Sequence, residues 1–231
     1  MSGPHACQTE IRIMKKAFFL LFLLLFLHEG LAFAETPPAV LLMQKTYGAM
    51  KSFETAFEQE LLQRESGVVQ KKNGILAFER PMKIDWATSS PAEEHIIVTG
   101  KEIWHYIPDE ALAYRYDMSM ADDSRSFLTV ITGNSDIEKH FDIEEALASP
   151  DDNGLKHFVL FPAEPTMQTV ECSLWIDAAT GFIGKAAVVD FYGNVNSVTF
   201  KGFRPNAAID GKRFDFVPPD GTEVEDRREK K

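Results

Sequence analysis

Residues that could do acid–base or metal chemistry are scattered along this chain. Beyond residue 34 the histidines are His95, His105, His140 and His157. No two of them have the i, i+4 spacing of a helical metal pair, and none has a cysteine or carboxylate partner in a recognised metal motif. The pairs Asp122–Asp123 and Asp151–Asp152 flank expected turns, where a solvated helix cap or loop explains them. We therefore expect no metal site, with a zinc site assembled in space from some of these histidines as the alternative.

Catalytic motifs are also absent from the sequence. It contains no Gly-rich phosphate loop, no G-x-S-x-G and no H-E-x-x-H. Cys172 is the one cysteine beyond residue 34, and its neighbours alternate between polar and apolar, which predicts a buried structural thiol. A reactive thiol needs a basic neighbourhood, which Glu171 and Ser173 do not supply. We expect no catalytic residue and no cofactor, although an enzyme whose catalytic residues are scattered in sequence would look the same.

A charged residue, Arg80, continues a row of apolar positions. Gly74, Leu76, Phe78 and Arg80 share one face of an expected strand, and Pro81 follows at once. A charge on a buried face must be paired or hydrogen-bonded. Arginine offers five donors, and the C-terminus of a helix presents carbonyl groups without partners. The alternative is that the strand ends here and that Arg80 reaches solvent.

The elements that would position these residues begin with one helix. Pro37 and Pro38 suit the first turn of a helix. An apolar stripe at spacings of three or four then runs through Val40, Met43, Tyr47 and Met50. A second, short helix is expected before Gly133, with an apolar face made of Phe127, Val130 and Ile131.

The rest of the chain is predicted to form strands. A period of two begins at Phe53 and is typical of half-buried antiparallel strands. The later strands are expected at residues 137–143, 156–161, 169–176, 183–191, 197–203 and 213–217. About ten or eleven strands would strain a flat open sheet, so curling or closure is expected. No linker or internal repeat divides the chain, which favours one domain after the N-terminal segment.

The two faces of this sheet differ in character. Glu54, Glu58 and Glu60 share one face of the first strand and predict a solvated surface. The opposite face carries large apolar residues: Phe57, Leu76, Phe78, Met82, Ile84 and Trp86. An ordinary filled core is the commoner explanation of such a face in small barrels. A compliant apolar lining of a cavity is the alternative, because methionine and aromatic side chains suit it.

The N-terminus predicts secretion. Lys15 and Lys16 precede eleven apolar residues, 17–27, and an A-x-A site ends at Ala34. This is the pattern of a signal peptide cleaved between Ala34 and Glu35. The apolar run is short for an uncleaved membrane anchor, which is the alternative. We expect residues 1–34 to be an N-terminal extension with a cleaved signal peptide, starting at Met1 or Met14, and residues 35–231 to be the mature domain.

Composition agrees with a soluble secreted domain. The 231 residues are 45% hydrophobic and 26% charged, which excludes a disordered chain. The formal net charge of −11 argues against nucleic-acid binding, because no basic surplus exists to neutralise phosphates. We expect a monomer that does not bind nucleic acid.

Several segments together resemble one family. Residues 78–86, FERPMKIDW, resemble the signature of the LolA family, the periplasmic carriers of outer-membrane lipoproteins. Residues 100–106 resemble the family's hairpin ending in Trp-x-Tyr, and residues 214–224 resemble its closing Phe-x-Phe, Pro-x-Gly and Val pattern. Residues 50–53 and Phe57 stand where the first helix of the family passes into its first strand. The resemblance spans about residues 37–226, nearly all of the expected mature chain.

The resemblance implies a fold and a function. It implies a mainly β fold with an α lid: a single curved antiparallel sheet of about 11 strands, forming an unclosed barrel covered by short helices. An apolar cavity between sheet and lid would take the acyl chains of lipoproteins, and the large apolar residues of the sheet, from Phe57 to Trp86, would line it. The family arginine corresponds to Arg80, which would hold the empty lid closed through Tyr47 in the first helix and through the short helix with Phe127, Val130 and Ile131.

The resemblance also implies partners. An inner-membrane ABC transporter would load the carrier with outer-membrane-directed lipoproteins, and an outer-membrane receptor of LolB type would unload it. Glu35 at the expected mature start argues against the chain being that receptor, which is itself a lipoprotein. Two alternatives stay open: a periplasmic lipid- or lipopeptide-binding sensor on the same fold, and a periplasmic enzyme that uses the cavity as its substrate site.

Overall fold

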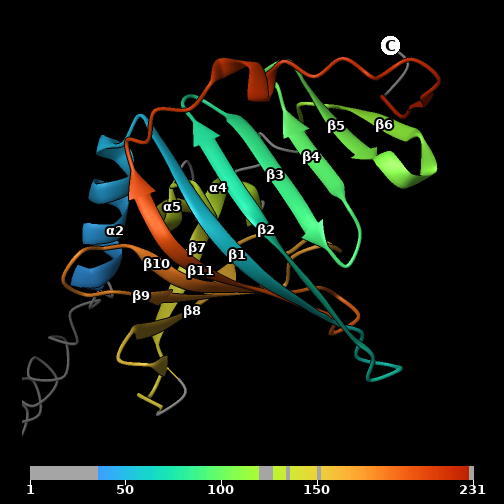
Figure 1. Ribbon diagram of the computed structural model, residues 1–231. Helices are drawn as coiled ribbons and strands as arrows, with labels where there is room; N and C mark the ends of the chain where they lie inside the picture. The colour runs from blue at the N-terminus through green and yellow to red at the C-terminus, as the bar shows by residue number, and fades with distance from the viewer. Residues whose placement is uncertain (1–35, 120–126, 134–135, 150–151, 229–231) are drawn as a thin grey trace, which may run out of the picture. The chain divides into compact units, whose positions relative to one another are not determined.

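The computed structural model describes residues 36–119, 127–133, 136–149 and 152–228 (Figure 1). The chain divides into Met1–Glu35 and Thr36–Lys231, and only the second unit is described below. The predicted signal peptide, the Ala34–Glu35 cleavage site, the pair Asp122–Asp123 and Asp151 lie outside the described residues. None of the helices among the described residues has the length and apolar composition needed to cross a membrane.

The described chain forms one twelve-stranded sheet and a few short helices. The strands are β1 (Ser52–Leu62), β2 (Val69–Glu79), β3 (Lys83–Ser90), β4 (Glu94–Val98), β5 (Glu102–Ile107), β6 (Leu112–Asp117), β7 (Phe141–Glu145), β8 (Lys156–Pro162), β9 (Glu171–Ile176), β10 (Ile183–Val189), β11 (Val195–Pro205) and β12 (Glu223–Asp226). The α-helices are α2 (Pro38–Ala49), α4 (Phe127–Ile131) and α5 (Ile137–His140), and the 3₁₀ helices are η1 (Pro108–Glu110) and η3 (Gly211–Phe214).

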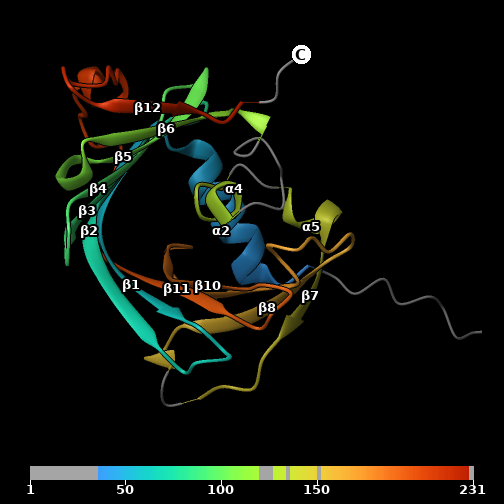
Figure 2. The same cartoon turned by 90° about the vertical axis from the view of Figure 1, so that its right-hand side faces the viewer.

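The sheet is open and mostly antiparallel. Its order is β12-β6-β5-β4-β3-β2-β1-β11-β10-β9-β8-β7, so that β12 and β7 are edges that do not pair with each other. Among the described strands, only β12 runs parallel to its neighbour, β6. The sheet curves around α2 and α4, which lie on its concave side (Figure 2). The expected mainly β fold with an unclosed curved sheet and short helices is confirmed, with twelve strands.

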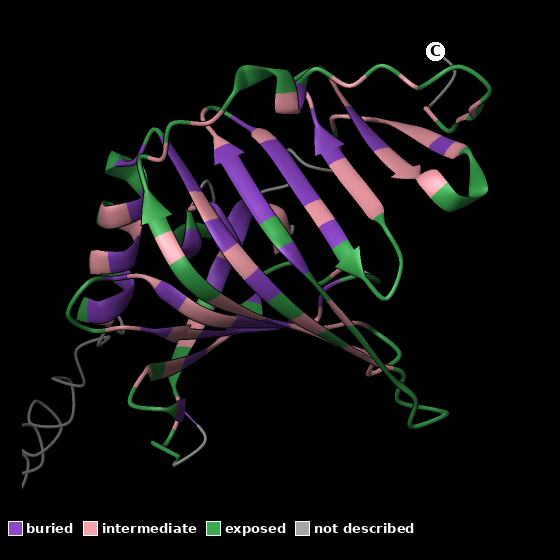
Figure 3. Cartoon of the chain, in the orientation of Figure 1, coloured by how far each residue is buried: buried purple, intermediate pink, exposed green. Residues whose placement is uncertain are grey.

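The longest pairing joins β1 to β2 and shows why this part of the sheet is tight. Phe53 faces Phe78 and Phe57 faces Gly74 across the two strands. A Cβ atom at Gly74 would lie 1.9 Å from the carbonyl oxygen of Ala87 on β3, so only glycine fits there. Burial alternates along β1 from Phe53 to Phe57, as the sequence period predicts, whereas Leu76, Ala77 and Phe78 of β2 are all buried (Figure 3).

The helix α2 closes one side of the core. Pro38 occupies its first turn, where a missing N–H costs nothing. Its buried residues are Ala39, Val40, Met43 and Tyr47, the face expected from the apolar stripe. The helix contacts β9, and α4 contacts β10, so both helices pack against strands that come late in the chain.

A second, smaller cluster lies on the convex side of the sheet. It contains Ile97, Trp104 and Ala113, with Tyr106 and Phe216 packed against it. The 3₁₀ helix η3 lies on β3 in the same region. The segment after β11 thus forms a strap, residues 207–217, across the convex face.

Two expected strands are wrong. The expected strand at residues 137–143 is instead α5 followed by β7, and Ile137 and Phe141, four residues apart, are both buried. The expected strand at residues 213–217 begins instead in η3. There Asp210 accepts a hydrogen bond from the Lys212 amide and starts a 3₁₀ turn, which Asp-Gly chemistry favours over a strand.

Candidate functional site

The apolar residues predicted to line a cavity lie together on the concave face of the sheet. Phe57, Leu76, Phe78, Ile84 and Trp86 come from β1, β2 and β3, and Met82 from the turn before β3. All are buried, and all belong to one hydrophobic cluster. Alternation within three paired strands brings them to one surface, since every second side chain points to the same face.

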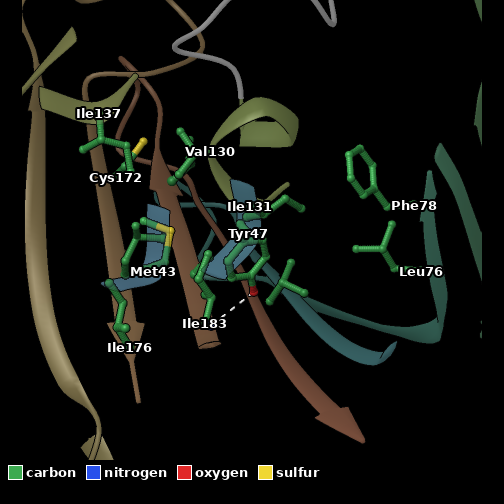
Figure 4. Packing of buried hydrophobic residues seen from close by; sticks show 14 of the residues in the cluster. Met43, Tyr47, Leu76, Phe78, Val130, Ile131, Ile137, Cys172, Ile176 and Ile183 are labelled. Atoms are coloured by element: carbon green, nitrogen blue, oxygen red, sulfur yellow. Dashed lines mark hydrogen bonds between the residues drawn. The ribbon is translucent and has the colours of Figure 1, made fainter. Parts of the chain in front are cut away.

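The helices cover this surface directly. Met43 and Tyr47 of α2, and Val130 and Ile131 of α4, belong to the same cluster and are buried. Figure 4 shows Tyr47 and Ile131 on the helices and Leu76 and Phe78 on β2 turned toward a common interior. In the described structure this part of the concave face is therefore covered by its own helices, as a filled core.

Aromatic rings make much of this contact. The Phe57 and Trp86 ring centres are 4.6 Å apart, and the Trp86 ring lies 6.3 Å from that of Phe127 on α4. Tyr47 meets Phe53 edge-on at 5.9 Å. Such pairs add about 0.5–1.5 kcal/mol each beyond the area that they bury. The two helices are thus held against the sheet chiefly by apolar and aromatic contacts.

Tyr47 also makes a polar contact inside the core. Its hydroxyl oxygen accepts a hydrogen bond from the Ile183 amide of β10 at 3.2 Å (Figure 4). Burial raises the pKa of Tyr47 well above its ordinary value, so the hydroxyl stays neutral. The bond ties α2 to the far half of the sheet.

Arg80 stands at the end of α2. Its Nε donates to the Met50 carbonyl oxygen at 2.8 Å and its Nη2 donates to the Tyr47 carbonyl oxygen at 2.7 Å. Tyr47 belongs to the last turn of the helix and Met50 is its cap; the Tyr47 carbonyl oxygen also accepts from the Met50 amide at 3.1 Å, so Arg80 adds a second donor to it. Phe127, Val130 and Ile131 of the short helix lie over the same concave face, against the cluster that Arg80 borders through Phe78.

One end of the concave face remains open. A pocket of about 380 Å³ lies there, and Phe127 is the one residue of its lining among the site residues predicted from the sequence. Its lining comprises Leu61, Phe127, Gln168, Thr169, Val188, Asp190, Asn194, Val195 and Asn196. The sequence reasoning placed only Phe127 near the site. Alternation along β1 assigns Leu61 to the same face as Phe57, and this signal could have found it.

Cys172, His95 and His157 lie outside this pocket. Within the described ranges, no three or more His, Cys, Asp or Glu side chains gather as they would around a metal ion. Cys172 is buried in the core cluster, and burial raises the pKa of its thiol to about 12, which agrees with a structural thiol. His157 and His95 contact carboxylates on the convex face instead.

One expectation about the convex face is corrected. Glu58 is 59% exposed, as expected for a solvated carboxylate, but Glu54 is only 17% exposed. Its carboxylate pairs with Arg204 on β11 and with Arg213 of the strap. Arg213 also contacts Asp85 at 2.8 Å, so Glu54 belongs to a network that fastens the strap to the sheet.

This chain, with its unclosed sheet and its apolar concave face under two helices, is similar to known proteins. The family model described as "Outer membrane lipoprotein carrier protein LolA" matches residues 48–217. The chain belongs to the LolA family. It is 32% identical over 189 residues to an outer-membrane lipoprotein carrier protein of Nitrosospira multiformis, a match covering 77% of this chain and 86% of that relative. A carrier protein of Nitrosomonas europaea is 25% identical over 175 residues, or 75% of this chain and 82% of the relative.

A solved structure supports the fold. An uncharacterized conserved protein from Thermus thermophilus matches with a TM-score of 0.52 over 82% of this chain and 97% of that one. At 11% identity this likeness shows the fold alone. Membership of the LolA family makes the protein a carrier of outer-membrane lipoproteins, a transport protein and not an enzyme.

Proposed function

We propose that this LolA-family carrier holds the acyl chains of its cargo on the concave face, in the place that α2 and α4 occupy here. The observation that carries the proposal is the burial of six large apolar residues, five in strands and Met82 in the turn before β3, beneath those two helices. When the helices move away, the exposed surface would be apolar and wide enough for chains. The helices would then serve as a lid that substitutes for cargo in the empty carrier.

Free energies explain why a carrier needs such an arrangement. Each buried CH₂ group is worth about 0.8 kcal/mol, and the acyl chains of a lipoprotein carry dozens of them. Free diffusion through water is therefore negligible. A site that simply buried every methylene would never release its cargo, whereas a lid that competes for the same surface weakens binding by the free energy needed to open it.

Arg80 supports the closed state in this proposal. Its hydrogen bonds to the Tyr47 carbonyl of α2 at 2.7 Å and to the carbonyl of the cap residue Met50 at 2.8 Å need the helix end in place. Hydrogen bonds from a charged donor contribute about 1.5–3 kcal/mol each. Losing one or two of them would favour the open state and strengthen cargo retention by roughly ten- to a thousandfold.

The route of the cargo completes the proposal. The protein is exported by a signal peptide cleaved between Ala34 and Glu35 and works in the periplasm, the compartment that the family serves. An ATP-driven inner-membrane transporter supplies the lipoprotein, and an outer-membrane receptor of LolB type accepts it where the organism has one. The acyl chains cross the aqueous space under the lid.

Arg80→Leu tests the proposal when loading and release are measured separately. Transporter-containing vesicles supply the lipoprotein in the first step, and purified receptor accepts it in the second. We expect loading to persist and release to fail. Arg80→Lys should restore release only in part, because one ammonium cannot direct donors to two carbonyls as the guanidinium does.

A matched control and clear alternatives accompany this test. Arg204→Leu removes an arginine that is 68% exposed on the convex face, and it should load and release normally. Unimpaired release by Arg80→Leu would contradict the proposed role of Arg80, and weaker loading would mean that Arg80 contacts the cargo instead. Loading that proceeds equally well without the transporter would favour a lipid-binding sensor.

A further inference from the structure

The pocket at the open end of the concave face differs from the covered part in being formed already. Leu61 of β1 and Val188 of β10 line one side, and Phe127 of α4 lines another. Val188 belongs to the core cluster and Phe127 packs against it. The pocket is therefore continuous with the surface beneath the lid, although α2 contributes nothing to its lining.

The rim of the pocket is polar, and the described residues that line it include no cation. They include Gln168, Thr169, Asn194 and Asn196, with Asp190 as the one ionisable side chain among them. The Asp190 carboxylate accepts hydrogen bonds from the Asn194 side chain and from backbone amides of its own turn, which lower its pKa and keep it anionic. A negative rim disfavours a free fatty-acid anion. It accepts a neutral ester or amide, to which carboxamide and hydroxyl groups can hydrogen-bond.

Exposed apolar side chains stand beside the same rim. Phe191 and Tyr192, at the tip between β10 and β11, are 65% and 69% exposed, and Met167 is 49% exposed. The Phe191 amide donates to the Met167 carbonyl oxygen at 3.1 Å, so the two tips adjoin. Asp190 and Gln168, the neighbours of these residues in sequence, line the pocket itself. An acyl chain approaching the pocket would pass apolar side chains before it reached the apolar walls.

We propose that this pocket binds one acyl chain of an incoming lipid anchor while α2 and α4 still cover the rest of the concave face, with the ester or amide linkage of that chain at the polar rim. This inference rests on the proposed carrier function and adds a first binding step to it. The volume, about 380 Å³, lies at the low end of ligand sites and suits one chain and not several. The remaining chains require the lid to move.

The test uses a neutral single-chain probe, a monoacylglycerol brominated along its chain. Trp86 reports on binding, because its ring lies 6.3 Å from Phe127 of the pocket and bromine quenches tryptophan at short range. The other two tryptophans lie on the convex side, where Trp104 belongs to the second cluster and Trp175 stacks on His157. We expect saturable quenching by the neutral probe and weaker binding of the brominated fatty-acid anion.

Adjacent residues of β1 supply matched variants. Leu61 lines the pocket and Leu62 does not, since neighbours in a strand point to opposite faces, yet both are partly exposed. Leu61→Glu should weaken probe binding by about tenfold or more, because it sets an ionised group against the chain. Leu62→Glu should bind like the unaltered protein. Leu61→Gln, a milder change, replaces Leu61→Glu if circular dichroism shows that the latter does not fold.

The outcomes separate this inference from the proposed function. If the Leu61 and Leu62 variants bind the probe equally, or if the unaltered protein does not bind it, the proposal that this pocket binds an acyl chain is wrong. Weak probe binding together with slower lipoprotein loading in Leu61→Glu supports it. Weak probe binding with an unchanged loading rate overturns the role in loading. A protein that loads no lipoprotein at all refutes the carrier proposal, while the probe still decides whether the pocket binds a chain.

Discussion

At the scale of single residues, Tyr47 makes three kinds of contact, two through its side chain and one through its backbone carbonyl. Its ring packs in the core, its carbonyl oxygen accepts from Arg80, and its hydroxyl accepts from the Ile183 amide. The helical stripe in the sequence predicts the burial of the ring. The hydrogen bond to Ile183 spans 136 residues of chain and has no local signal, so no reading of neighbouring residues could find it.

Tyr47→Phe should destabilise the protein although the ring remains. The change leaves the buried Ile183 amide without its acceptor, which costs about 1–3 kcal/mol. Urea unfolding followed by far-ultraviolet circular dichroism measures the free energy of unfolding. Tyr192→Phe, at an exposed position, should stay within about 0.5 kcal/mol. Equal stabilities of the two variants would show that the Ile183 amide does not depend on Tyr47.

The three glutamates of β1 give a second test at this scale. Glu54→Gln should lower the free energy of unfolding by about 1–3 kcal/mol, because it removes the carboxylate that Arg204 and Arg213 share and leaves Arg213 with Asp85. Glu58→Gln should change it by no more than about 0.5 kcal/mol, since its pairing with Lys201 is exposed. Thermal unfolding of both variants decides. If Glu58→Gln lowered the stability more than Glu54→Gln, the stabilising role of the network around Glu54 would be contradicted.

Two histidines on the convex face should respond to pH in opposite senses. The carboxylates of Asp85 and Glu93 raise the pKa of His95, whereas burial, with Lys185 nearby, lowers the pKa of His157 despite Asp152 and Glu171. A raised pKa stabilises the fold below the ordinary histidine value of about 6.5, and this stabilisation is lost as pH rises through the folded-state pKa. A lowered pKa gives stabilisation that is present above that value and lost as pH falls.

Unfolding at about pH 5.5 and about pH 8, on either side of the ordinary histidine pKa, tests this. His95→Gln should cost more stability at the lower pH, and His157→Gln should cost more at the higher pH. The effect of His95→Gln also involves the strap, because Asp85, the partner of His95, contacts Arg213 as well. The same pH trend in both variants would exclude one of the two assigned environments.

At the scale of elements, alternation predicted most strands because each face of the sheet has its own environment. The two failures have different causes. Ile137 of α5 and Phe141, the first residue of β7, are both buried, and their spacing of four fits a helix as well as a strand over so short a segment. In the strap, Phe214 is buried by contacts with a distant part of the chain. β12, only four residues long and parallel to β6, has too short a pattern to be predicted at all.

The docking of α2 depends on a glycine that the sequence reasoning used only as a helix end. Gly133, just after α4, has φ +68°, and a Cβ atom there would lie 2.3 Å from the Cβ of Tyr47. Gly133→Ala should therefore push α2 away from the sheet. We expect greater binding of an apolar fluorescent dye and slower release of lipoprotein. Both readouts follow from a more easily opened lid.

Gly67→Ala is the control for this change, because Gly67 has the same left-handed backbone conformation as Gly133 but different surroundings. Gly67, with φ +67°, has no atom within 4 Å of an added Cβ. Gly67→Ala therefore carries the same cost of a left-handed conformation, about 1 kcal/mol, without the contact with Tyr47. If dye binding rises equally in both variants, the effect comes from general destabilisation and not from α2.

At the scale of the whole described unit, the proposed function makes the open sheet and its covering helices one two-state device. A closed barrel would admit acyl chains only through its ends, and a sheet without the helices would expose its concave face to water. With β7 and β12 unpaired to each other, the sheet can keep its curvature while the helices move. The sequence alone could suggest this apolar face but not decide whether helices or cargo cover it, because both provide the same burial.

Hydrogen–deuterium exchange of the carrier with and without bound lipoprotein tests this picture. Cargo that takes the place of the lid should leave amides of β1 and β2 protected, since their ladder at Phe53–Phe78 and Phe57–Gly74 is not altered. Amides of α2 and α4 should exchange faster, because those helices lose the sheet contacts that stabilise short helices. A carrier mixed with a lipoprotein lacking acyl chains is the control and should match the empty protein. Unchanged protection of both helices in the fully loaded carrier would mean that the acyl chains bind elsewhere, and the apolar concave face would then be only a core.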